Sequence, residues 1–174
     1  VTNDLAIGLR IPIEAAEIVK LSFGSALSKE VGSRDVVELQ KIDPRAQGTA
    51  TKKFIAEIIE DRLAEIFELV NTEVKRVGKI SSLPAGAVLV GAGAKMPNIA
   101  ELARQELKLA AQIGVPVLGP LKPASAELAL QAEDPEFATA IGLLLYDEGQ
   151  HDDQKPATKP VSYGLKKILD YFIP

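Results

Sequence analysis

Cysteine is absent from the 174 residues, and histidine occurs once, as His151. The lack of cysteine excludes disulfide bonds and thiolate metal sites. A single histidine, in a polar stretch, offers little to a Ser–His or Cys–His catalytic pair or to a zinc site with two histidines. The composition therefore argues against hydrolytic and zinc-dependent active sites of these kinds.

Long apolar runs are missing as well, because no stretch reaches the roughly 18 uninterrupted apolar residues that span a bilayer. The first residues, Val1-Thr2-Asn3-Asp4, include no basic region followed by an apolar one, so they do not form a signal peptide. Since an initiator methionine is also lacking, we expect the chain to be a piece of a longer protein.

Positive charge is not concentrated anywhere in the sequence. The 20 lysines and arginines are scattered among 24 acidic residues, and the net charge is −4. Nucleic-acid binding usually needs a concentrated basic face, so DNA and RNA are disfavoured as partners. The length of 174 residues suits one compact domain or two small lobes with a sizeable core, and with 47% hydrophobic residues most of the chain should be folded.

Two short helices are expected in residues 1–24. Thr2 or Asn3 is suited to cap the first helix. Pro12 is suited to the first position of the second helix, because its missing N–H is not needed there, and Gly24 is suited to end it.

A charged pair interrupts the apolar face of the second of these helices. Glu17 and Lys20 are three residues apart and share that face with Ile13. Two interpretations stay open. The pair is either a structural ion pair at a lobe boundary or a device that hydrogen-bonds the hydroxyl groups and edge of a ligand.

The strongest helical pattern covers residues 51–77, where apolar residues recur every three or four positions. Thr51 is a plausible N-cap, and Gly78 ends the pattern. The outer face is acidic, which is typical either of a solvated face or of a partner surface. Just before this helix, residues 35–42 predict an edge strand.

A small-residue turn follows an apolar run in residues 87–96, and a helix is expected from Pro97. Turns of this kind either allow tight packing or bring the backbone close to a phosphate or nucleoside. Further along, residues 115–118 predict a short strand, and residues 134–146 predict a last apolar helix.

The composition changes abruptly after residue 146. Residues 147–162 are polar and predict a flexible linker. Residues 163–174 predict a short amphipathic helix, which must dock on its own domain, on a partner groove or on a membrane surface. Its apolar face comprises Leu165, Ile168, Leu169 and Phe172, and two lysines, Lys166 and Lys167, lie elsewhere.

Several of these stretches together resemble FtsA, the actin-like bacterial cell-division family. The order, the spacing and the tethered tail helix all agree with that family, and the resemblance covers nearly the whole chain. The matching stretches are residues 2–6, 12–20, 56–62, 65–70, 88–96 and 138–146.

The resemblance implies an α/β, actin-like (ribonuclease H-like) ATPase fold of which this chain is the second half. It also divides the chain into subdomains, a linker and a tail. These are subdomain 2A in residues 1–24 and 78–132, subdomain 2B in residues 25–77, a helix returning to subdomain 1A in residues 133–146, the linker 147–162 and an amphipathic membrane-targeting helix in residues 163–174.

The resemblance also implies a function in cell division. Members of this family bind ATP between their two halves, polymerise head to tail and tie FtsZ filaments to the inner membrane at the septum. The implied cofactors are ATP and Mg²⁺. The implied partners are FtsZ, further copies of the protein and inner-membrane lipids, with other divisome proteins as further candidates. The implied location is peripheral, on the cytoplasmic face of that membrane.

The phosphate loops and the acidic residues that organise Mg²⁺ would lie upstream of Val1. We therefore expect no catalytic residue and no metal ligand in this chain, and no ATP hydrolysis by the chain alone. The remaining roles fall on three groups of residues. They are the nucleotide contacts Gly91, Ala92, Gly93, Ala94, Lys95, Glu17 and Lys20, the membrane contacts Leu165, Lys166, Lys167, Ile168, Leu169 and Phe172, and the partner surface Glu57, Asp61, Arg62 and Glu65.

The chain departs from the family pattern at three positions. Val90 stands where a hydroxyl residue is usual, and Ala92 stands where glycine is usual. Alanine is tolerated in such a turn if φ stays negative. Asp61 stands where the family commonly has proline before Arg62, which leaves the helix less bent.

Three other interpretations stay open. A pilus-assembly ATPase of the PilM type shares the fold, but such proteins do not normally end in a linker and an amphipathic helix. A sugar kinase or a heat-shock chaperone of the same superfold is disfavoured, because no sugar-binding or general-base residue stands out. An α/β interaction module without a nucleotide is the last of these alternatives.

Overall fold

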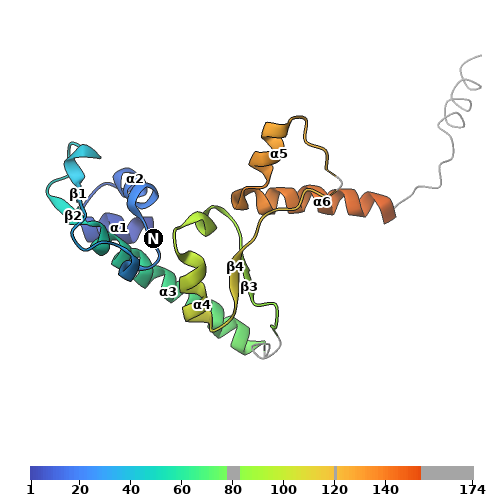
Figure 1. Ribbon diagram of the computed structural model, residues 1–174, viewed down its shortest axis with the longest axis horizontal. Coiled ribbons are helices and arrows are strands. Elements are labelled where there is room, and N and C mark those ends of the chain that lie inside the picture. The colour runs from blue at the N-terminus through green and yellow to red at the C-terminus, as the bar shows by residue number, and fades with distance from the viewer. Residues whose placement is uncertain (78–82, 120, 154–174) are drawn as a thin grey trace, which may run out of the picture.

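One long helix, α3 (Lys52–Arg76), contacts elements from both the N-terminal and the middle part of the chain. The computed structural model describes residues 1–77, 83–119 and 121–153, which form a mixed α/β structure. Figure 1 shows α3 passing the N-terminal helices at one end and α4 at the other. It thereby connects two groups of elements, each with its own cluster of buried apolar side chains.

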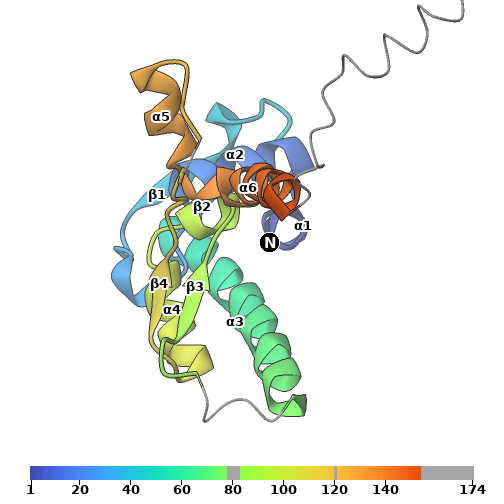
Figure 2. The ribbon, with the colours of Figure 1, turned by 90° about the vertical axis from the view of Figure 1, so that its right-hand side faces the viewer.

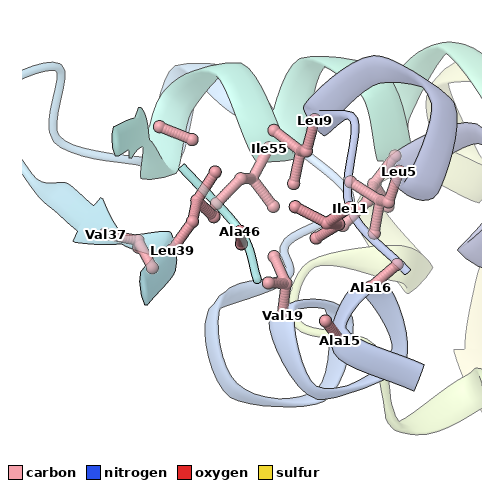
Figure 3. Close-up of a cluster of buried hydrophobic side chains, with 12 residues drawn as sticks. Leu5, Leu9, Ile11, Ala15, Ala16, Val19, Val37, Leu39, Ala46 and Ile55 are labelled. Carbon is pink, nitrogen blue, oxygen red and sulfur yellow. The ribbon is translucent and has the colours of Figure 1, made fainter. Parts of the chain in front are cut away.

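The first group consists of α1 (Thr2–Leu9), α2 (Ile13–Phe23), β1 (Val36–Glu38), β2 (Thr49–Thr51) and the first half of α3. The strands β1 and β2 are antiparallel, with Val37 opposite Ala50. Figure 3 shows the apolar side chains of these elements pointing toward one another. The first cluster comprises Leu5, Leu9, Ile11, Ala15, Ala16, Val19, Val37, Leu39, Ala46, Ala50, Ile55 and Ile59.

The second group is a β–α–β unit. The strands β3 (Ala87–Leu89) and β4 (Ala111–Ile113) are parallel and are joined through α4 (Ile99–Leu107). α4 contacts both α3 and β4, so it forms a layer between α3 and the two strands, as Figure 2 shows. The second cluster comprises Ala26, Leu27, Phe67, Ile99, Leu102, Ala103, Leu107 and Ala111.

Beyond the strands lie α5 (Ala126–Ala132), a short 3₁₀ turn and α6 (Ala138–Asp153). Figure 1 shows α6 extending away from the strands and from α3. Two of its three leucines, Leu143 and Leu144, are exposed by 65% and 56%. Among the helices that the structure describes, none combines the length and the hydropathy needed to cross a membrane.

Two predicted helix boundaries are confirmed, namely the start of α3 and the end of α2. Thr51 caps α3, because its hydroxyl accepts a hydrogen bond from the Phe54 amide at 3.1 Å. Gly24 ends α2, but with φ near −70°, so the reason for glycine is space. A Cβ at Gly24 would lie 2.3 Å from the Lys20 carbonyl oxygen.

The predicted cap of α1 is wrong. Val1 is the N-cap residue of that helix, and no side chain there accepts a capping hydrogen bond. Thr2 is the first helical residue, and its hydroxyl bonds Glu17 instead. Pro12 is likewise the N-cap of α2 and precedes its first residue by one position.

Three other boundaries differ from those expected. Only Val36–Glu38 of the predicted strand 35–42 is extended, and a 3₁₀ turn follows. The expected strand at 115–118 is wrong, because the strand that pairs with β3 is Ala111–Ile113. The helix expected from Pro97 begins at Ile99, after a 3₁₀ turn.

The C-terminal expectations are only partly covered by the structure. α6 continues to Asp153, whereas the sequence places a linker from residue 147. The rest of that linker and the amphipathic helix 163–174 lie outside the described residues, as do all the predicted membrane contacts.

Candidate functional site

A pocket of about 360 Å³ lies between α2 and the turn that follows β3. The helix contributes charged side chains, and the turn contributes small residues and backbone. These two segments are far apart in the sequence and are brought together because both groups pack on α3 and on each other near Met96. The pocket is lined by Glu17, Lys20, Leu21, Ala92, Gly93, Lys95, Met96 and Pro97.

Most of the residues predicted to contact a nucleotide line this pocket. Gly91 and Ala94 are not among the lining residues, and Ala94 is buried in the turn. The sequence interpretation missed three apolar lining residues, Leu21, Met96 and Pro97. In the sequence, these three residues are distinguished only by lying next to or near residues that were predicted to contact a nucleotide.

The two charges of α2 form a network with Thr2. Lys20 Nζ donates to Glu17 Oε2 at 2.7 Å, and the Thr2 hydroxyl donates to the same oxygen at 2.7 Å. Lys20 Nζ also donates to Thr2 Oγ1 at 3.1 Å. The hydrogen bonds from Lys20 and then from Thr2 hold the pKa of Glu17 below its ordinary value, so Glu17 is a carboxylate at neutral pH.

The turn itself needs glycine at one position and offers open space at another. Gly91 has φ of 90°, a conformation that other residues rarely adopt, and its amide donates to the Pro135 carbonyl at 2.8 Å. Gly93 lies outside the left-handed region, and a Cβ placed on it would meet no atom within 4 Å. At Gly93 the wall of the pocket is therefore bare backbone.

Lys95 links the turn 91–95 to the segment before α6 through two ion pairs. Its ammonium lies 2.7 Å from Asp134 Oδ2 and 3.4 Å from Glu136 Oε2. The hydrogen bond to Asp134 is the main cause that raises the pKa of Lys95. The sequence interpretation missed both acidic partners, because Asp134 and Pro135 were interpreted only as the start of a helix. Lys95 thus borders the pocket with its charge already paired.

The chemistry that the pocket offers is that of a mixed polar and apolar ligand. Among the interactions described, none engages Glu17 Oε1, which remains an acceptor, and Lys20 has three donors of which two are used. Leu21, Met96 and Pro97 supply apolar surface. Such a pocket suits a ligand that combines hydrogen-bonding groups with apolar surface.

The predicted partner surface on α3 is partly committed to contacts inside the molecule. Arg62 makes a two-pronged ion pair with Asp4 of α1, at 2.8 Å from Nε and 2.6 Å from Nη2. It also donates to Glu65 at 2.7 Å. Arg62 therefore braces α1 against α3, and Asp4 is a residue that the sequence interpretation missed.

The acidic members of that surface are more accessible. Glu57 lies 4.0 Å from Lys53 on the same exposed face. Asp61 and Glu65 line a shallow polar groove of about 530 Å³ between α3 and α4. The groove also contains Ala64, Glu68, Asn71, Thr72, Lys75 and Glu106.

The brace between Asp4 and Arg62 predicts a loss of stability in acid. The hydrogen bonds from Arg62 are the main cause that lowers the pKa of Asp4 from 3.8 to about 2. A carboxylate with a lowered pKa stabilises the fold above its unfolded pKa and loses that contribution as pH falls through the folded pKa. We expect the free energy of unfolding to fall between about pH 4 and pH 2, and less steeply in Asp4→Asn.

Urea unfolding at several pH values checks this expectation. Glu38→Gln is the control, because Glu38 and its partner Lys41 are both exposed and belong to one short segment. If Asp4→Asn followed the wild-type pH profile, the brace would have no role in acid stability.

Known proteins similar to this chain were found by sequence. A family model described as Cell division protein FtsA matches residues 1–142. The Cell division protein FtsA of Pseudomonas aeruginosa is 32% identical over 166 residues, which cover 94% of this chain and 38% of that protein. The protein of the same name from Bacillus subtilis is 33% identical, over 84% of this chain and 30% of that protein.

The Cell division protein FtsA of Escherichia coli K12 is 30% identical, over 97% of this chain and 41% of that protein. The chain thus spans about two fifths or less of the length of these relatives. The match covers most of the chain and includes α1 to α5, the pocket and the brace. The resemblance noted in the sequence is therefore confirmed, and the chain belongs to the FtsA family of cell division proteins.

Proposed function

We propose that this chain is the second half of an actin-like, ATP-binding FtsA protein that acts in bacterial cell division. In this proposal the adenosine part of ATP lies between α2 and the turn 91–95. The observation that carries it is the pocket that joins Glu17 and Lys20 to Ala92 and Gly93. The family membership supports the role in cell division.

The residues that line the pocket fit a nucleoside. The free Glu17 oxygen would accept from ribose hydroxyls, and the remaining N–H of Lys20 would donate to a hydroxyl or ring nitrogen. Bare backbone at Gly93 leaves room for the base, which Met96 and Leu21 would contact through apolar surface. ATP supplies the phosphoryl group for hydrolysis, and the residues that would hold its phosphates and Mg²⁺ are proposed to lie outside this chain.

Two further parts of the proposal follow from the same family membership. We infer that FtsZ is bound through the acidic face of α3, where Glu57, Asp61 and Glu65 are accessible. We also infer that residues 163–174 attach the protein to the inner membrane, since their sequence places four apolar residues on one helical face. Both interactions, together with head-to-tail assembly, would place the protein at the septum.

ATP binding by the full-length protein that contains this chain tests the central proposal. We expect Lys20→Met to weaken ATP binding about tenfold, because a hydrogen bond to a charged group is worth about 1.5–3 kcal/mol. Titration calorimetry with ATP measures the affinity, and a thermal melt shows that the variant is folded.

Lys41→Met is the matched control, because Lys41 is exposed by 74%, pairs with Glu38 among the described residues and does not line the pocket. The control should bind ATP as the wild type does. If the wild-type protein bound no adenine nucleotide, or if Lys20→Met bound it with unchanged affinity, the pocket would not be the ATP site.

A further inference from the structure

Thr2 links both charges of the pocket from a different helix. Its hydroxyl donates to Glu17 Oε2 at 2.7 Å and accepts from Lys20 Nζ at 3.1 Å. A hydroxyl has one donor and two acceptor sites, so it satisfies a carboxylate and an ammonium at once. Valine, which has the same shape, can do neither.

Thr2 itself is held in place by the core. It opens α1, and α1 is anchored by Leu5 and Leu9, which are exposed by 0% and 8%. Asp4, two residues further along α1, is bonded by Arg62 of α3. The position of the Thr2 hydroxyl is therefore fixed, and the longer, more flexible side chains of Glu17 and Lys20 bond to it.

Thr2 lies behind Glu17 when viewed from the pocket. Glu17 lines both the pocket and an adjoining shallow hollow, which is also lined by Thr2, Ile13 and Glu14. Thr2 lines the hollow and is not among the residues that line the pocket, so it does not touch a ligand that fills the pocket. Its influence on such a ligand must pass through Glu17 and Lys20.

The network decides which hydrogen-bonding sites remain for a ligand. Thr2 and Lys20 together occupy Glu17 Oε2, which leaves Oε1 as the available acceptor. Thr2 and Glu17 take two N–H groups of Lys20 and leave one donor. One fixed acceptor beside one fixed donor matches two neighbouring hydroxyl groups, each of which can donate and accept.

We propose that Thr2 is a positioning residue that orients Glu17 and Lys20 for the two hydroxyls of a ribose and so sets the preference for ribonucleotides over deoxyribonucleotides. This inference rests on the proposed function, because it takes the pocket to be the nucleoside site. Without the hydroxyl, Glu17 and Lys20 still pair with each other, but the direction of Oε1 is no longer fixed.

Two variants of Thr2 test the inference in the full-length protein that contains this chain. Thr2→Val removes the hydroxyl, and Thr2→Ser keeps it. Thr72→Val is the control, because the Thr72 hydroxyl donates to the Glu68 carbonyl at 3.0 Å on an exposed part of α3, away from the pocket. The dissociation constants for ATP and 2′-deoxyATP are measured by calorimetry, and the titration of the Glu17 carboxyl carbon is followed by NMR without nucleotide.

We expect the wild type, Thr2→Ser and Thr72→Val to prefer ATP to 2′-deoxyATP by the same factor. In Thr2→Val this preference should fall about tenfold or more, which corresponds to the loss of a hydrogen bond at a charged group. The pKa of Glu17 should also rise toward its ordinary value in Thr2→Val alone, because one of the two hydrogen bonds that lower it is gone.

The outcomes separate the inference from the proposed function. If the wild type bound ATP while Thr2→Val kept its preference, or weakened both nucleotides equally, Thr2 would not set that preference. If the titration of Glu17 were the same in Thr2→Val and the wild type, Thr2 would not orient it. If the wild type bound neither nucleotide, the proposed function and the nucleotide preference would both be wrong.

Discussion

Gly93→Val is expected to weaken ATP binding about a hundredfold while leaving the fold intact. The valine side chain would project from the turn into the pocket of about 360 Å³, where a Cβ meets no protein atom within 4 Å. Overpacking a close contact costs about 1–3 kcal/mol, and each 1.4 kcal/mol is about tenfold in affinity. We expect the loss of binding free energy to lie near the upper end of this range, because bare backbone forms that part of the pocket wall.

Gly93 makes a cleaner test than its neighbour Gly91. Gly91 has φ of 90°, so any side chain there would strain the turn as well as fill space. The matched control is Gly142→Val in α6, where a Cβ also meets no atom within 4 Å. Calorimetry gives the ATP affinity, and thermal melts of both variants give the stability. Equal ATP affinity in Gly93→Val and Gly142→Val would show that no ligand approaches the turn.

Ile59→Ala is expected to lower the free energy of unfolding by about 2–5 kcal/mol. Ile59 is fully buried on α3 and belongs to the first cluster. The atoms removed leave a cavity that the surrounding helices cannot close without moving, so the loss exceeds the transfer free energy alone. Since small domains are stable by only about 5–15 kcal/mol, this variant should be marginal.

Ile66→Ala is the control for this core substitution. Ile66 is on the same helix, two turns further along, and is exposed by 42%. The same atoms are deleted, but most of the cavity term is missing, so the loss should be about 1 kcal/mol or less. Urea unfolding of both variants gives the comparison. A loss at Ile66 as large as that at Ile59 would mean that the first cluster is not the main source of stability.

The parts of the fold that were predicted correctly are those with a long repeating signal. The helix at 51–77 was placed within one residue, because its apolar period is sustained over 25 residues and Thr51 supplies a cap. β4 was missed because Ala111–Ile113 is only three residues long and has no alternating pattern of its own. The β-branched residues near 115–118 looked more like a strand, but Pro116 cannot donate to a ladder.

The site was predicted by a different route from the fold. Spacing showed that Glu17 and Lys20 share a helical face, yet nothing in the spacing connects them to Ala92 and Gly93, and only the resemblance to a family did so. Thr2 was mistaken for a cap, because a threonine before a helix usually is one. The acidic partners of Lys95 could not be found either, since contacts between distant segments depend on tertiary packing.

Two apolar side chains connect the two hydrophobic clusters of the protein. Leu63 of α3 and Met96 at the edge of the pocket both pack against the first and the second hydrophobic cluster. With 25 residues, α3 is about 37 Å long and contributes side chains to both clusters. Because Met96 packs against both clusters and lines the pocket, a ligand that displaced Met96 would disturb the packing of both clusters at once.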